Sequence, residues 1–115
     1  MGGRKVDLSP YPAVVGRLTR NISFLVNVQK TSGATSVEVQ LFDVTDAVQV
    51  TSTNLTHSAN NDLTELSSGS LTVGSSSGNL RSDAPKVYEV NVRMNGGGPS
   101  DQVFVANARL LVTYT

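Results

Sequence analysis

The stretch at residues 103–114 constrains the fold of this chain more than any other. Apolar residues recur there at every second position, namely Phe104, Ala106, Ala108, Leu110, Val112 and Tyr114. In an extended strand such residues share one face, and the residues between them share the other. A single strand cannot bury an apolar face, so this one requires neighbouring strands and a second layer above it. The stretch therefore predicts a β-sandwich.

The same two-residue period runs through three further segments, residues 18–30, 37–42 and 86–94. A short glycine-containing connection, residues 31–35, joins the first two segments and predicts an antiparallel hairpin. Residues 95–101 contain three consecutive glycines and a proline. They predict a second hairpin, between the third segment and the closing strand.

The middle of the chain is less regular. The adjacent apolar residues Leu41 and Phe42 predict either a bulge or a strand that leaves the sheet edge. Further on, we expect one strand over residues 63–73 that is interrupted near Gly69, with a short helix over residues 62–66 as the alternative. Together the segments give about seven or eight strands joined by short connections.

The predicted fold class is all-β: an antiparallel two-sheet β-sandwich, jelly-roll-like, with an extended amino-terminal arm. An immunoglobulin-like sandwich has a similar strand count, but the absence of cysteine and tryptophan argues against a true immunoglobulin domain. The chain divides into the arm, residues 1–16, and a single β-sandwich domain, residues 17–115.

The arm combines glycine and proline with scattered apolar residues, a mixture typical of an extended segment because proline cannot donate a ladder hydrogen bond. Such an arm either packs along its own sandwich as an edge segment or reaches a neighbouring subunit or host surface. The residues that would carry a partner contact are Arg4, Lys5, Leu8, Tyr11, Arg17 and Arg20.

Composition argues against several classes of function. Nine basic and nine acidic residues leave no net charge, so we expect no binding to nucleic acid or to an anionic membrane. Cysteine is absent, which removes disulfides, thiolate nucleophiles and thiolate metal ligands. The sequence has no apolar run long enough to span a membrane and no recognisable export signal, which favours assembly in the cytoplasm.

Few residues are suited to catalysis. The only histidine, His57, lies in a polar loop without a nucleophile-elbow glycine pattern, and we interpret it as a surface side chain. Glu38, Glu65 and Glu89 could supply carboxylates for glycoside hydrolysis, but nothing in the sequence pairs them. We therefore expect no enzyme activity and assign no catalytic residues.

Metal and cofactor sites are equally poorly supported. Oxygen-rich turns at Asp43, Asp46 and residues 60–62 could suit calcium, which prefers clustered oxygen ligands. Their spacing matches no EF-hand loop, and Asp and Asn are favoured in turns because their side chains bond to the backbone. The glycines at 96–98 lack the following helix of a phosphate-binding loop. We assign no metal and no cofactor.

Three segments, residues 37–45, 87–92 and 106–114, resemble a known class of protein. Their strand chemistry is similar to that of small jelly-roll modules in bacteriophage virion proteins and in bacterial surface or carbohydrate-binding proteins. The resemblance spans about residues 18–115. It implies a non-catalytic module, often trimeric, that decorates a capsid, forms a head or tail fibre, or adheres to a surface.

We therefore expect a structural protein of a bacteriophage particle, a capsid decoration or fibre-type subunit on the virion surface. The expected partners are further copies of the chain, with a trimer favoured, and other virion proteins such as the major capsid protein. The alternative is a carbohydrate-binding or adhesive module for surface glycans, although tryptophan is absent and Tyr88 and Tyr114 fall on expected core faces. A remote alternative is a small carboxylate-dependent hydrolase.

Overall fold

The computed structural model describes residues 4–6, 14–15 and 18–114, with side chains from Asn21 to Thr113. This part of the chain is all-β and contains no helix, and so no helix that could cross a membrane. Five of its strands are long and six have only two or three residues. The strands are β1 (Arg4–Val6), β2 (Val14–Val15), β3 (Leu18–Lys30), β4 (Ser36–Asp43), β5 (Val48–Gln49), β6 (Leu55–His57), β7 (Thr64–Ser70), β8 (Val73–Gly74), β9 (Leu80–Arg81), β10 (Lys86–Asn95) and β11 (Val103–Tyr114).

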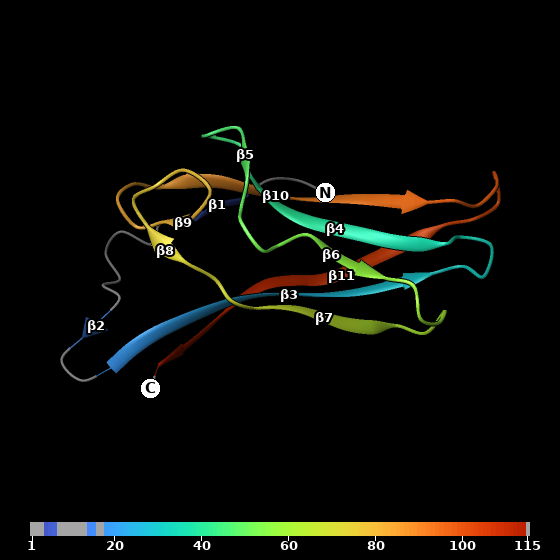
Figure 1. Ribbon diagram of the computed structural model, residues 1–115, viewed down its shortest axis with the longest axis horizontal. Helices are drawn as coiled ribbons and strands as arrows, with labels where there is room; N and C mark the ends of the chain where they lie inside the picture. Colours follow the sequence, from blue (N-terminus) through green and yellow to red (C-terminus); the bar gives the residue numbers. More distant parts are fainter. Residues whose placement is uncertain (1–3, 7–13, 16–17, 115) are drawn as a thin grey trace.

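Two antiparallel sheets form a β-sandwich, which confirms the predicted architecture (Figure 1). The first sheet has the order β1-β10-β4-β5, and β6 also pairs with β4. The second has the order β11-β3-β2, and β7 also pairs with β3. Across the sandwich β10 faces β11, β4 faces β3, and β6 faces β7. A small parallel pair, β8 with β9, lies beside them.

The core lies between the central strands of the two sheets. Alternate residues of β3 and β4 point inward, as their two-residue period predicts. Successive side chains of a strand point to opposite faces, so the residues between them point outward. The residues of these two strands that form the hydrophobic core are Ile22, Phe24, Val26, Val28, Val37, Val39 and Leu41. Val50, Leu71, Leu80 and Tyr88 complete the core from the middle of the chain and from β10.

Both predicted hairpins are wrong. β3 pairs with β11 and β4 pairs with β10, so the connections at residues 31–35 and 95–101 cross from one sheet to the other. Both crossings lie at the same end of the molecule, on the right of Figure 1. Two backbone hydrogen bonds join the two connections. The amide of Thr31 donates to the carbonyl oxygen of Gln102 at 3.0 Å, and the amide of Thr35 donates to the carbonyl oxygen of Asn95 at 2.9 Å.

The closing strand departs from the predicted alternation. Its register with β3 shifts between Ala106 and Arg109, where Asn107 has a φ of 53°. An extra residue in a strand exchanges the inward and outward positions beyond it. Val103 and Val105 therefore pack against the core before the bulge, and Ala108 and Leu110 do so after it. The predicted inward positions Phe104 and Ala106 are exposed instead.

The predicted irregularity near Gly69 is present, but the predicted single strand over residues 63–73 is wrong, because β7 ends at Ser70 and Val73 belongs to β8. The alternative helix over residues 62–66 is also wrong. β7 runs through this region, and its register with β3 shifts between Ser23 and Leu25. Gly69 has a φ of 70°, a conformation that glycine adopts without steric cost. The amide of Phe24, which faces the irregularity, donates to the hydroxyl of Ser68 at 2.9 Å.

Adjacent Leu41 and Phe42 produce no bulge. The register of β4 with β10 is continuous from Ser36 to Asp43, so Leu41 faces the core and Phe42 faces outward. β4 then ends at Asp43.

Candidate functional site

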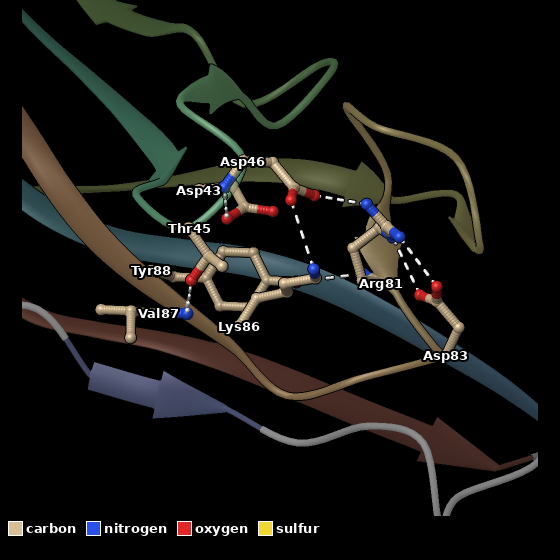
Figure 2. A network of polar contacts seen from close by, with 8 residues as sticks. All are labelled: Asp43, Thr45, Asp46, Arg81, Asp83, Lys86, Val87 and Tyr88. Atoms are coloured by element: carbon tan, nitrogen blue, oxygen red, sulfur yellow. Dashed lines mark hydrogen bonds and ion pairs between the residues drawn. The ribbon is translucent and has the colours of Figure 1, made fainter.

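A network of polar side chains closes one end of the sandwich, where β4 ends near the loop between β9 and β10 (Figure 2). The carboxylate of Asp43 lies on the core side of β4 and is fully buried. Its Oδ1 accepts a hydrogen bond from the amide of Asp46 at 3.0 Å, which makes the turn after β4. The expectation that this aspartate acts as a turn former is confirmed.

Arg81 links two carboxylates in this network. Its guanidinium forms an ion pair with Asp46 and two hydrogen bonds with Asp83, at 2.9 and 2.8 Å. Lys86 adds a second cation to Asp46, with Nζ 3.2 Å from Oδ1. Both oxygens of Asp46 are therefore engaged by cations, which draws the turn after β4 against the β9–β10 loop.

These contacts shift the pKa values of the groups involved. The hydrogen bonds from Arg81 lower the pKa of Asp83 to about 2. Burial raises the pKa of Asp46, but the hydrogen bond from Lys86 and the charges of both cations outweigh it and hold that pKa below its ordinary value. The hydrogen bond with Asp83 raises the pKa of Arg81 above its already high value. All three groups thus stay ionised at neutral pH.

Tyr88 connects the network to the core. It pairs in register with Asp43, and its hydroxyl accepts a hydrogen bond from the amide of Arg81 at 3.0 Å. Its side chain is buried, which raises the pKa of the hydroxyl. On the outer side, the amide of Val87 donates to the hydroxyl of Thr45 at 2.9 Å. The network therefore holds three segments of the chain together.

The chemistry of this network is that of a structural clamp. A catalytic carboxylate must reach a substrate, whereas Asp46 is held by two cations and Asp43 is enclosed. Oδ2 of Asp43 has no hydrogen-bond partner among the described residues. However, Arg81 and Lys86 are both paired with the nearby Asp46, and their positive charges would repel a metal ion bound at Asp43. In the part of the chain that the structure describes, no three His, Cys, Asp or Glu side chains are placed to hold a metal.

His57 is buried, so its interpretation as a surface side chain is wrong. It ends β6 and pairs in register with Val37 on the inward face. Its Nε2 lies 3.0 Å from the carbonyl oxygen of Asn60 and 3.5 Å from the hydroxyl of Thr64. The ring therefore ties β6 to the loop that leads into β7.

Glu38 and Glu65, two of the three carboxylates considered for hydrolysis, belong to different sheets, and the third, Glu89, lies on β10 opposite Phe42. Glu38 is on the outer face of the first sheet, bonded to Arg93 at 2.8 Å and to Asn95 at 2.8 Å. The hydrogen bond from Arg93 lowers its pKa most. Glu65 belongs to the second sheet and forms an ion pair with Arg109. The structure thus brings neither of them opposite the other.

A shallow groove of about 320 Å³ lies on the outer face of the first sheet. Cross-strand pairs of β4 and β10 supply its polar side chains, since Glu38 is opposite Arg93 and Gln40 is opposite Asn91. The lining residues are Glu38, Val39, Gln40, Asn54, Asn91, Val92 and Arg93. They offer hydrogen-bonding groups to a ligand, but this set contains no aromatic ring on which a sugar could stack.

We use the name open side for the side of the sandwich formed by the edges of β10 and β11. No described strand pairs with the outer edge of β11, and β1 covers only the first residues of β10. Four apolar side chains of these two strands are exposed by 39 to 50%, namely Val92, Phe104, Leu111 and Val112. The opposite side is closed by β6 and β7. The open side therefore carries four of the six large apolar side chains that are exposed among the described residues.

The predicted arm contacts are only partly located. The backbones of Arg4 and Lys5 form β1, opposite Tyr88 and Val87 of β10, and Arg20 lies in β3 opposite Tyr114. Leu8, Tyr11 and Arg17 are outside the described residues. The described pieces of the arm, β1 and β2, pair with strands of the chain's own sheets.

The search for known relatives found no match: no family model, no curated protein and no solved structure resembles this chain closely enough to be reported. The open side was not anticipated from the sequence, although the run Leu110, Leu111, Val112 offered a signal, because apolar residues on both faces of a strand suit contacts on both faces.

Proposed function

We propose that the chain is a non-catalytic structural subunit that acts by protein–protein contact on the surface of a larger particle. The observation that carries this proposal is the open side, where a long strand edge that no described strand pairs with coincides with exposed apolar side chains. Exposed apolar side chains along the edge of a sheet are typical of an interaction site. The particle that best fits the strand chemistry of the chain is a bacteriophage virion, with the chain as a capsid decoration or fibre-type subunit.

The state of the polar groups supports a structural role over a catalytic one. Asp46, Asp83 and Glu38 are each bonded to cationic side chains, and His57 is enclosed against a backbone carbonyl. Groups that are fully engaged within the fold gain stability from those bonds and are not poised to exchange protons with a substrate. Contact through a repeated, individually weak surface needs no such groups.

The proposal is tested by purifying the virions of a bacteriophage that encodes this chain. We expect the chain to co-sediment with the particles in a density gradient, and to appear as regular surface density when particles with and without it are imaged. Chain that stays entirely in the soluble fraction would contradict the proposal. A version that lacks residues 1–16 separates the two interpretations of the arm, because it should lose attachment only if the arm is the tether.

A further inference from the structure

We propose that two copies of the chain pair through the outer edges of β11, antiparallel and related by a two-fold axis at Leu111. The second sheet would then continue from one subunit into the other. This inference rests on the proposed function and names the first partner of its contact surface: a second copy of this chain. A two-fold contact makes a dimer, which differs from the trimer that the resemblance implies.

The edge of β11 is long and regular where the pairing would occur. Beyond the bulge, residues 109–114 keep an unbroken register with residues 20–25 of β3. A stretch of this length presents a row of backbone donors and acceptors about 20 Å long. In the described part of the chain nothing pairs with that row on its outer side.

Proteins protect free strand edges with proline, charged side chains and irregularities, and β11 carries a bulge at Asn107 and a charge at Arg109 but none of these features beyond them. Residues 110–113 are Leu, Leu, Val and Thr, without a charge or a proline. The other edges differ. β7 carries Glu65, several serines and the irregularity at Gly69, and the β10 edge has β1 and the exposed Arg93. Residues 110–113 of β11 are therefore better suited to a partner strand than the edges of β7 and β10.

A second copy satisfies this edge because a strand edge is complementary to its own antiparallel copy. A two-fold axis perpendicular to the sheet places the core side of both copies on the same side of the extended sheet. Each residue of β11 must therefore lie opposite a residue whose side chain points to the same face. With the axis at Leu111, the two Leu111 side chains meet on the outer face and Leu110 meets Val112 on the inner face. Arg109 then lies opposite Thr113, so no like charges meet.

The expected affinity is modest. Specific protein–protein interfaces bury at least about 1,200 Å² in total, and an edge of six residues buries less surface than that. We therefore expect a dissociation constant on the order of 10 μM for the isolated dimer. Repetition of the contact on a particle would raise its effective strength without any new contact.

Sedimentation velocity of the full chain over a range from about 1 to 200 μM tests the pairing, a range chosen to bracket the expected affinity. The wild type should shift from monomer to dimer, and Leu111→Lys should remain monomeric across the range because two charges would meet at the axis. Leu63→Lys is the matched control, since Leu63 is an exposed leucine, 59% accessible, outside β11. It should dimerise like the wild type. A monomeric wild type, or a dimer that Leu111→Lys does not weaken at least tenfold, overturns the inference.

A cross-link locates the axis and traps the dimer covalently even when its affinity is weak. The chain has no cysteine, so Leu111→Cys introduces a single thiol. Under mild oxidation it should yield a disulfide-linked dimer, whereas Leu63→Cys should stay monomeric at the same concentration. Failure of Leu111→Cys to link, or equal linking by both variants, overturns the inference.

Loss of the dimer on deletion of residues 1–16, with Leu111→Lys still dimeric, assigns the contact to the arm and also overturns it. None of these results bears on co-sedimentation with virions. The proposed function is therefore tested independently of the pairing.

Discussion

Arg81 shows how far single residues could be interpreted from the sequence. The turn role of Asp43 and Asp46 follows from their residue type alone, since an Asp side chain bonds readily to a nearby backbone amide. The partner of Asp46 could not be predicted, because Arg81 lies 35 positions further along the chain in a stretch without regular alternation. For the same reason His57, surrounded by polar neighbours in sequence, gave no sign that its strand pairs inward with Val37.

The clamp around Arg81 makes stability depend on pH in the acid range. Asp83 has a pKa of about 2 in the folded chain against an ordinary 3.8, so the unfolded chain takes up its proton at higher pH than the folded chain. Its contribution to stability is therefore complete above about pH 4 and is lost as the pH falls through about 2. We expect the free energy of unfolding, measured by urea titration, to fall over this interval.

Arg81→Gln should reduce that fall, because the pKa of Asp83 would return toward its ordinary value. Arg109→Gln is the control, since it removes an ion pair whose two side chains are 43 and 51% exposed. Exposed pairs contribute little to stability, so this variant should keep the acid dependence of the wild type. Equal acid dependence in wild type and Arg81→Gln would contradict the clamp.

β11 illustrates the limit of periodicity at the scale of one strand. Its alternation predicted a strand correctly, but not which residues face the core. Asn107 sits at a position assigned to the polar face, where an asparagine raises no conflict with the pattern. Asparagine tolerates the left-handed conformation that a bulge requires. Because it is also polar, it fits the alternating pattern, and the pattern therefore gives no sign of the register shift at this residue. Arg109 completes the bulge by donating to the carbonyl of Asn107 at 2.8 Å.

Substitution at Asn107 tests the bulge. Asn107→Val should destabilise the fold by about 1–2 kcal/mol, because a β-branched residue is strained at a φ of 53°. Asn107→Gly should be tolerated, since glycine adopts positive φ freely. Both are measured by urea unfolding. A valine variant as stable as the glycine variant would mean that the strand runs straight through this point and that Phe104 faces inward.

At the scale of the whole molecule, the sequence predicted the layers but not the connections. Alternation in residues 18–30 and 37–42 requires that each apolar face be covered, and it does not say whether neighbours in sequence lie side by side or face to face. In the structure they lie face to face, across the roughly 10 Å between packed sheets. Connections of this length can make either arrangement, and no two-residue turn with glycine at the positions of a tight hairpin was present to decide it.

This topology should make folding slow. Each long strand of the core pairs with one far away in sequence: β4 with β10, and β3 with β11. Chains dominated by such distant pairings fold in milliseconds to seconds, because the loop entropy is lost before the contacts are gained. Stopped-flow refolding followed by tyrosine fluorescence should give rates in that range. Refolding in microseconds would contradict the strand order.

The placement of β11 beside β3 also affects how the chain is made. A ribosome produces β3 early and β11 last among these strands, so one hydrogen-bonding edge of β3 is made well before the strand that pairs with it. That edge stays without β11 until residues 103–114 have been synthesised, and unpaired strand edges in incompletely folded chains are prone to aggregate. We therefore expect chaperones that shield β3 during synthesis to raise the yield of folded protein.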